Sequence, residues 1–173
     1  EQVGVGGQLR LKAIVVRKNG DDDLAKRASL LRKDSVHGKL AGTVTIDHEN
    51  ERLIVNGNAI QMIYANHPRE VDYTKYDINN ALVIDNMGIW KDRKDLSQHF
   101  EAKGATQVLL TAPAGDDIEN VVYGINHNNV DLEHETIFSA ASCTTNCIAP
   151  VLQIIEDKYG IDNGHIETIH AYT

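Results

Sequence analysis

The sequence contains little cysteine, no long apolar run and no secretion signal. Its two cysteines, Cys143 and Cys147, lie four positions apart, too close for a disulfide between them to stabilise the fold. Such a low cysteine content is typical of a reducing, cytoplasmic environment. No apolar run approaches the roughly 20 residues that cross a bilayer. No signal-peptide pattern opens the chain. These absences favour a cytoplasmic protein that has no membrane among its partners.

Positive charge is also scarce. Lysine and arginine number 17 against 25 aspartates and glutamates, a formal net charge of −8 over 173 residues. Because an acidic surface repels nucleic acid and anionic membranes, we expect neither as a partner. The composition, 42% hydrophobic and 24% charged, is that of an ordinary globular protein. The chain starts at Glu1 without Met and stops at Thr173 inside a predicted strand, so we expect a piece of a longer protein.

Apolar runs alternate with helical patterns, which predicts an α/β sheet. The run at 81–85 is nearly continuous, as expected of a parallel strand covered on both faces, and the Asn56-Gly57 dipeptide predicts a hairpin. Helices are predicted at 21–31, 94–103 and 143–158. Strands are predicted at 9–17, 43–47, 53–55, 59–64, 81–85, 107–111, 120–123, 136–141 and 165–172. The best domain boundary lies near Ala141, which divides the chain into 1–141 and 142–173.

Cys143 sits where a predicted strand becomes a helix. Free backbone N–H groups and the positive end of the helix dipole stabilise a thiolate at that place, and the thiolate is the nucleophilic form. Ser142, Thr144 and Thr145 add hydroxyl groups around the helix end. Together they predict a reactive thiol beside a pocket for an anion such as phosphate.

Alternatively, Cys143 is a small buried residue that only packs in the core, which is the more common role of a lone cysteine. Cys147, one turn further along the predicted helix, is expected to be buried packing. Two sulfurs at helical spacing without a nearby His or Cys cluster do not fill a tetrahedral metal site, so no metal is expected.

His170 is the natural partner for the thiol. It closes the apolar run 166–169, and an imidazole can take a proton from a thiol or from a substrate hydroxyl. A histidine at a strand end is nevertheless more often structural or exposed, and the chain contains 8 histidines.

The run ASCTTNCIAP at 141–150, followed by TIHAYT at 168–173, closely resembles the glyceraldehyde-3-phosphate dehydrogenase family. His170 follows Cys143 by 27 positions, the family spacing between nucleophile and base. Segments 34–38, 110–114 and 124–127 agree as well, so the resemblance covers about 9–173. It implies an incomplete Rossmann-like, mostly parallel sheet over 1–141, a partial dinucleotide-binding domain, which runs into the start of an α+β catalytic domain at 142–173.

The resemblance also implies a reaction. The parent enzyme would oxidise glyceraldehyde 3-phosphate to 1,3-bisphosphoglycerate, with hydride transfer to NAD and with inorganic phosphate as second substrate. Cys143 would form a thiohemiacetal and then a thioester, and His170 would act as base. By motif match, Ser142 and Thr144 would contact the attacking phosphate, and Thr173 the phosphate of the substrate.

Further roles follow from the same resemblance. Gly88 and Thr111 match positions beside the cofactor, and Asn146 matches a structural support of the cysteine turn. The full-length protein is expected to be a cytoplasmic homotetramer of glycolysis or gluconeogenesis. The sequence departs from the family at two positions near the expected site. Met87, beside the cofactor, stands where the family usually has threonine, and Ala140, before the cysteine run, stands where it usually has asparagine.

Another departure concerns the cofactor. Where the family usually has an acidic residue for the adenosine ribose, the strand ends in Arg17 and Lys18, and two cations there favour a 2′-phosphate, so NADP is an additional candidate. Alternatively both cations point to solvent and Asp21 takes the acidic position.

The glycine-rich phosphate loop is a further departure. Gly4, Gly6 and Gly7 do not supply it, since a strand and not a helix follows them. The family's arginine for the substrate phosphate and its late asparagine would lie beyond Thr173. We therefore expect this piece alone to be an incomplete enzyme.

Two alternatives stay open. One is a related enzyme that acts on another sugar-phosphate aldehyde, erythrose 4-phosphate. The other is a catalytically silent fragment that binds a partner or assembles, although such a module has no physical reason to keep both Cys143 and His170.

Overall fold

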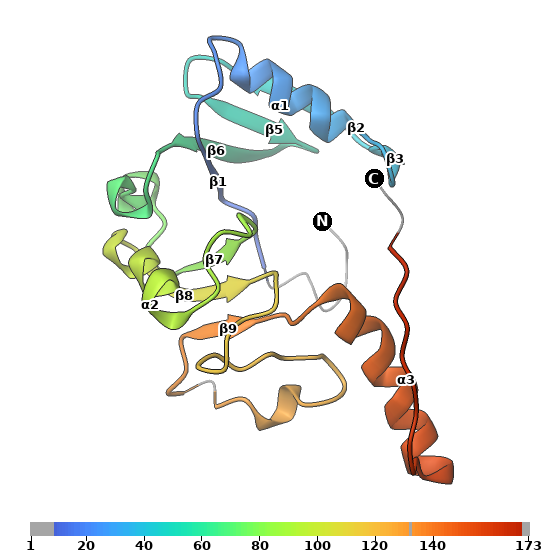
Figure 1. Cartoon of the computed structure of the whole chain (residues 1–173). Helices are drawn as coiled ribbons and strands as arrows, with labels where there is room; N and C mark the ends of the chain where they lie inside the picture. Colours follow the sequence, from blue (N-terminus) through green and yellow to red (C-terminus); the bar gives the residue numbers. More distant parts are fainter. Residues whose placement is uncertain (1–8, 132, 171–173) are drawn as a thin grey trace. The chain divides into compact units, whose positions relative to one another are not determined.

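The computed structural model describes residues 9–131 and 133–170, and the chain divides into two compact units, Glu1–Ile78 and Asn79–Thr173. Both combine strands with helices, which confirms the predicted α/β class (Figure 1). The division at residue 78 separates compact units, and the boundary between 1–141 and 142–173 stays a prediction.

The first unit is built on a four-stranded sheet in the order β1-β6-β5-β4. Its strands are β1 Ala13–Val16, β4 Val44–Asp47, β5 Arg52–Val55 and β6 Asn58–Tyr64. β1 pairs with β6 in parallel, and β6, β5 and β4 pair antiparallel. The predicted hairpin is confirmed: Asn56 and Gly57 adopt φ of 49° and 80° between β5 and β6.

Helix α1, Asp23–Arg32, packs on this sheet and closes the first core. It begins at Asp23, two residues after the predicted start at 21, and its N-cap Asp22 makes no side-chain cap hydrogen bond. The buried residues of the core are Leu24, Ala28, Val44, Leu53 and Met62. A short hairpin of β2 Lys33–Asp34 and β3 Gly38–Lys39 follows α1, and two 3-10 turns, η2 Pro68–Glu70 and η3 Tyr73–Tyr76, end the unit.

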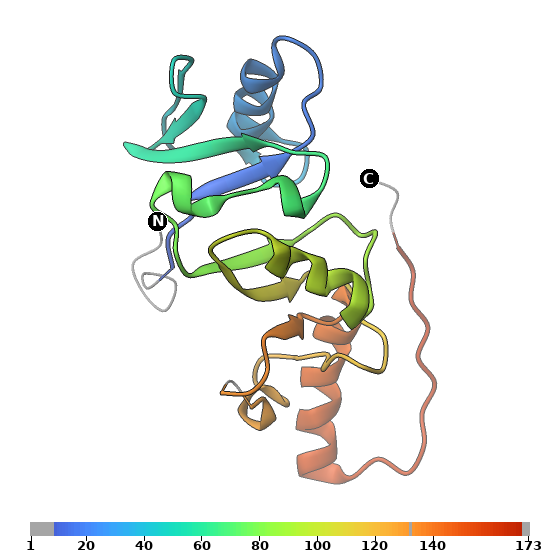
Figure 2. The same ribbon diagram turned by 90° about the vertical axis from the view of Figure 1, so that its left-hand side faces the viewer.

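The second unit is built on a parallel sheet in the order β7-β8-β9 (Figure 2). β7 Ala81–Asp85 has the predicted bounds, and β8 Ala105–Leu110 and β9 Ile137–Ser139 follow. Helix α2 Arg93–Leu96 continues into the 3-10 helix η4 Ser97–Glu101, which packs on β8. A further 3-10 turn, η5, spans His127–Asn129, and helix α3 spans Cys143–Tyr159. The second core contains Leu96, Val108, Leu110, Ile118 and Ile137.

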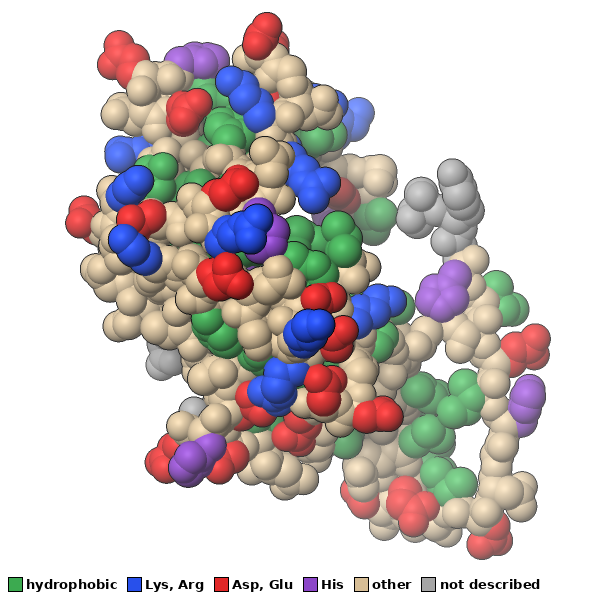
Figure 3. Space-filling model, turned by 60° about the vertical axis from the view of Figure 1, so that its left-hand side comes forward, with side chains coloured by type: hydrophobic (Ala, Val, Ile, Leu, Met, Phe, Trp, Pro, Cys, Tyr) green, Lys and Arg blue, Asp and Glu red, His purple; other side chains and the backbone are tan. Residues whose placement is uncertain are grey.

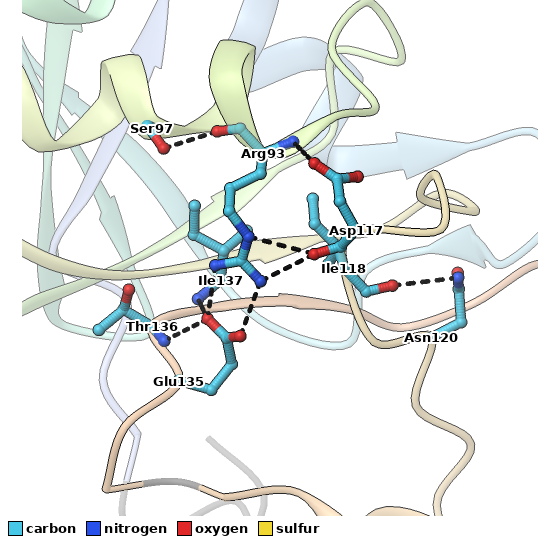
Figure 4. Close-up of polar contacts among 8 residues, drawn as sticks. All are labelled: Arg93, Ser97, Asp117, Ile118, Asn120, Glu135, Thr136 and Ile137. Atoms are coloured by element: carbon cyan, nitrogen blue, oxygen red, sulfur yellow. Dashed lines mark hydrogen bonds and ion pairs between the residues drawn. The ribbon is translucent and has the colours of Figure 1, made fainter.

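Arg93 connects three segments of this unit (Figure 4). Its guanidinium donates two hydrogen bonds to Glu135, at 2.9 and 2.7 Å, and two to the carbonyl of Asp117, at 3.1 and 2.9 Å. Glu135 in turn accepts from the backbone N–H groups of Thr136 and Ile137. The start of α2 is thereby fixed to the loop before Ile118 and to the start of β9, the strand that leads to Cys143.

Three predicted elements are wrong. The helix expected at 94–103 is α-helical only to Leu96 and then tightens into η4. The strand expected at 120–123 is reduced to one isolated bridge between Asn120 and Ser139, and the Asn120 side chain bonds to the backbone of Ala114. The last strand is not seen in its described part, 165–170, because no described strand pairs with it.

The surface mixes both signs of charge over the face seen in Figure 3. Helix α3 has no buried residue. Several large apolar side chains of α3 and of the segment after it are exposed: Val151, Ile154, Ile155, Tyr159, Ile161, Ile166 and Ile169. Within the described ranges every helix is too short or too polar to serve as a membrane span. The same residues hold no group of three or more His, Cys, Asp or Glu side chains arranged for a metal ion.

Candidate active site

The candidate site lies at one edge of the second unit's sheet. Because β7, β8 and β9 are parallel, their carboxyl ends share an edge, which is where α/β sheets bind ligands. Three segments leave the sheet there: 86–88 after β7, 111–114 after β8, and 140–143 after β9. They contain four of the predicted site residues, Gly88, Thr111, Ser142 and Cys143.

Cys143 is the first residue of α3, as the sequence predicts. Its thiol is free and exposed. Ser142 is the N-cap, and its hydroxyl accepts a hydrogen bond from the Thr145 N–H at 2.9 Å. The N–H groups of a first helical turn have no partner within the helix, so those of Cys143 and Thr144 point out of the helix end beside the thiol. This geometry suits a developing oxyanion.

The turn before Cys143 is conformationally unusual. Ala141 is buried and adopts a left-handed φ of 57°, which a residue with a Cβ rarely takes. Asn146 stabilises it from α3, because its side-chain amide donates to the carbonyls of Ala140, at 2.7 Å, and of Ser142, at 2.9 Å. Asn146 therefore bonds to the backbone on both sides of Ala141, as a structural support would.

The hydroxyl groups predicted for an anion pocket are gathered at the helix end. The Ser142 hydroxyl lies 2.9 Å from that of Thr144 and 2.6 Å from that of Thr145. Thr173 lies outside the described residues. Cys147 was expected to be buried, and this expectation is wrong: its thiol is exposed.

His170 lies in the exposed segment after α3, which forms neither helix nor strand over residues 161–170. Among the described residues, no hydrogen bond joins its imidazole to Cys143. The structure thus places the thiol in its predicted position and does not bring the predicted base to it.

Thr111, one of the two predicted cofactor residues of this unit, joins a cluster of hydrogen bonds with the segment after β7. The Thr111 hydroxyl lies 3.1 Å from the Asp85 carbonyl and 2.7 Å from Oδ1 of Asn86. Gly88 adopts a φ of 69°, and no atom lies within 4 Å of where a Cβ would stand. Gly88 and Thr111 both lie at the carboxyl edge of the sheet, and their contact with a dinucleotide stays a prediction.

Sequence reasoning missed the pair that supports this cluster. The Asp85 carboxyl, which is buried, accepts from the Met87 N–H at 2.7 Å and lies 2.9 Å from Nε2 of His99. His99 in turn packs edge-on against Trp90, with ring centroids 5.3 Å apart. An acidic residue that ends an apolar strand was the available signal, because a buried carboxyl needs a partner.

Arg17 and Lys18 lie at the end of β1 in the first unit, and both are exposed. The Lys18 ammonium lies 5.8 Å from the ring centroid of Tyr64. Beside them, Arg27 donates to the carbonyl of Arg17 at 3.1 Å and pairs with Asp23 at 2.6 Å. The hydrogen bond from Arg27 lowers the pKa of Asp23. Asp23 is buried at the start of α1, and its pairing with Arg27 was not predicted from the sequence.

A pocket of about 410 Å³ opens on the second unit. Its lining is mainly apolar: Leu109, Val121, Tyr123, Val130, Phe138 and Ala140, with His127, Ser139 and Asn146. Among its polar side chains, His127 accepts from the Gly124 N–H through Nδ1, and Ser139 and Asn146 bond near Ala141.

Two family models match the chain. One is described as "Glyceraldehyde 3-phosphate dehydrogenase, NAD binding domain" and matches residues 7–93. The other is described as "Glyceraldehyde 3-phosphate dehydrogenase, C-terminal domain" and matches residues 142–173.

Curated relatives agree. A glyceraldehyde-3-phosphate dehydrogenase-like protein of Pseudomonas aeruginosa is 56% identical over 173 residues, which is 100% of this chain and 37% of that protein. Glyceraldehyde-3-phosphate dehydrogenase of Priestia megaterium is 38% identical over 159 residues, 92% of this chain and 46% of the relative. Glyceraldehyde-3-phosphate dehydrogenase 2 of Bacillus subtilis is 35% identical over 184 residues, 99% of this chain and 53% of the relative. The chain thus spans between about a third and half of the length of these relatives.

Proposed function

Because the chain belongs to the glyceraldehyde-3-phosphate dehydrogenase family, we propose that it is part of an enzyme that oxidises glyceraldehyde 3-phosphate in the presence of inorganic phosphate. The observation that carries the proposal is the position of Cys143. An exposed thiol opens α3 at the carboxyl edge of a parallel sheet, beside the N–H groups of the first helical turn. The product would be 1,3-bisphosphoglycerate.

Cys143 is the nucleophile in this proposal. Its thiolate attacks the aldehyde carbon, and the new C–S bond makes a thiohemiacetal whose oxygen accepts from the Cys143 N–H. Loss of hydride from that carbon leaves a thioester. Inorganic phosphate then attacks the thioester carbon, forms the acyl phosphate and releases the thiolate. Ser142 and Thr144, gathered at the helix end, are the proposed contacts of that phosphate.

His170 is the proposed base, and Thr173 the proposed contact of the substrate phosphate. Support comes from the sequence, because TIHAYT follows the cysteine run at the family spacing. The proposal requires residues 161–170 to take an arrangement in which the imidazole reaches the thiol. Their exposure and lack of regular structure leave them without competing backbone pairing.

NAD is the cofactor, as the match to an NAD-binding domain indicates. Bound NAD supplies the hydride acceptor. Gly88 and the loop of Thr111 fit one side of it, whereas the sequence contains no glycine-rich strand–turn–helix for the pyrophosphate. Use of NADP by way of Arg17 and Lys18 is proposed in addition, since both cations are exposed at the end of β1.

The test uses the protein that contains this chain. NADH formation from glyceraldehyde 3-phosphate should depend on phosphate and should be abolished by Cys143→Ser, whereas Cys147→Ser, one turn along the same exposed helix, should retain activity. Greater activity with erythrose 4-phosphate would identify that tetrose phosphate as the substrate. No activity with either aldehyde would favour the catalytically silent fragment.

We also propose that the whole protein is a cytoplasmic homotetramer. Analytical sedimentation measures the oligomeric state, and cell fractionation measures the localisation.

A further inference from the structure

Ser139, the last residue of β9, has a fully buried hydroxyl that joins three segments. It accepts a hydrogen bond from the Ala141 N–H at 3.0 Å. Its single proton faces two acceptors, the Ala112 carbonyl at 2.7 Å and Oδ1 of Asn120 at 2.9 Å. One side chain thus bonds to the turn before Cys143 and to the loop after β8.

Asn120 extends this connection. Its Oδ1 accepts from the Ala114 N–H at 2.9 Å, and its Nδ2 lies 3.3 Å from the Ala114 carbonyl. The loop after β8, which begins at Thr111, is therefore hydrogen-bonded at Ala112 to Ser139 and at Ala114 to Asn120. Asn120 is itself bonded to the Ser139 hydroxyl, so both connections include that hydroxyl.

The backbone of Ala141 explains why this bond matters. A left-handed φ of 57° is unfavourable for a residue with a Cβ, so it persists only where neighbouring groups enforce it. Asn146 acts on the carbonyls on either side of Ala141, and Ser139 is the partner of its N–H. Ala141 lies two residues before Cys143, and its backbone angles set the direction in which the chain enters α3.

We propose that Ser139 is a positioning residue for Cys143: its buried hydroxyl holds Ala141 in the left-handed conformation and fixes the cysteine turn against the loop after β8. The inference rests on the proposed function, in which Cys143 is the nucleophile. It assigns Ser139 no contact with substrate. Without the hydroxyl, Ala141 relaxes, the first turn of α3 shifts, and the thiol loses its alignment with the helix end.

The experiment measures iodoacetamide alkylation of Cys143 at fixed pH, by peptide mass spectrometry, with Cys147 as internal reference in the same molecule. Ser139→Ala should slow Cys143 by about 10-fold, within the range that small displacements of a reacting group produce, and leave Cys147 unchanged. The matched control is Ser97→Ala, which also removes a hydroxyl that bonds to a carbonyl, that of Arg93 at 2.6 Å, without contact with the turn. It should leave both rates unchanged.

A second substitution separates positioning from general packing. Glycine adopts positive φ without the Cβ penalty, so Ala141→Gly added to Ser139→Ala should restore most of the Cys143 rate. Failure of this rescue, or an unchanged Cys143 rate in Ser139→Ala, would overturn the inference while leaving the nucleophile assignment intact. If Cys143 is no faster than Cys147 in the unsubstituted chain, the proposed function fails, and the inference fails with it.

Discussion

Nε2 of His99 lies 2.9 Å from Oδ2 of Asp85, and both side chains are almost fully buried. The other carboxyl oxygen of Asp85 accepts from the Met87 N–H, so one acidic side chain joins η4 to the turn that contains Gly88. The turn at the candidate cofactor edge is therefore held by a residue 14 positions further along the chain. A substitution at His99 should act on the fold and on that turn together.

His99→Ala should lower the free energy of unfolding by about 2–3 kcal/mol, because Oδ2 of Asp85 is left buried without its partner and the ring contact with Trp90 is lost. Urea unfolding of the chain measures it. The matched control is His134→Ala, since His134 lies 2.8 Å from Asp131 in a pair that is exposed on both sides. That substitution should change the stability by less than about 0.5 kcal/mol, and equal losses would contradict the argument.

Glu135 should make the stability of the chain depend on acid pH. Hydrogen bonds from Arg93, with smaller contributions from the Ile137 and Thr136 N–H groups, lower its pKa from 4.5 to about 2. The folded state thus favours the ionised form, and this stabilisation is complete above about pH 4.5 and disappears as the pH falls toward 2.

Glu135→Gln should accordingly destabilise the chain at pH 7 by about 1 kcal/mol, a modest figure because the ion pair is partly exposed to solvent. The difference from the unsubstituted chain should shrink between pH 4.5 and 2. Thermal unfolding over this range measures it. The control Glu133→Gln removes the charge of an exposed neighbour, and its stability difference from the unsubstituted chain should not change with pH. The same pH dependence in both variants would contradict the prediction.

The features that the sequence predicted correctly have local physical causes. β7 has the bounds of its continuous apolar run, and the Asn56-Gly57 dipeptide forms the turn between β5 and β6. Helix α3 begins at Cys143 and ends before Gly160, which takes a positive φ of 75°. Each of these signals is complete within a few neighbouring residues.

The features that it missed depend on distant partners. Residues 120–123 have strand-like composition, yet Asn120 bonds with its side chain to Ala114 and Ser139. The contacts of Asp85 with His99 and of Ser139 with Ala112 join residues that no periodic pattern relates. The motif could place the reactive thiol, whereas the groups that hold its turn are visible only once the chain is folded.

Gly57→Ala isolates the cost of one backbone conformation. Gly57 has a φ of 80° and nothing within 4 Å of a Cβ position, so the substitution causes strain without a clash. We expect a loss of about 1 kcal/mol in the free energy of unfolding, measured with urea. Gly164→Ala is the control, because it also has open space and its φ lies outside the left-handed region. No difference between the two variants would contradict this account.

Cys143 should react faster with iodoacetamide than Cys147 near neutral pH. Both thiols are exposed on one helix, so accessibility does not separate them. Cys143 opens α3, where the backbone N–H groups of the first helical turn can donate to a negatively charged sulfur, whereas Cys147 lies one turn inside. We expect about a 10-fold ratio of rates by peptide mass spectrometry. Equal, slow rates would count against the nucleophile.

Arg17 and Lys18 should govern the choice between NAD and NADP in the protein that contains this chain. The two cations are exposed at the end of β1, and a 2′-phosphate adds charge that exposed cations attract. Replacing both with alanine should lower kcat/KM for NADP by about 10-fold or more and change that for NAD by less than about twofold, because only NADP carries the phosphate. Lys26→Ala, an exposed cation on α1, is the control and should alter neither value. If the unsubstituted protein uses NAD alone, both cations only face the solvent, and the proposal for NADP is wrong. The family assignment and the use of NAD would be unaffected.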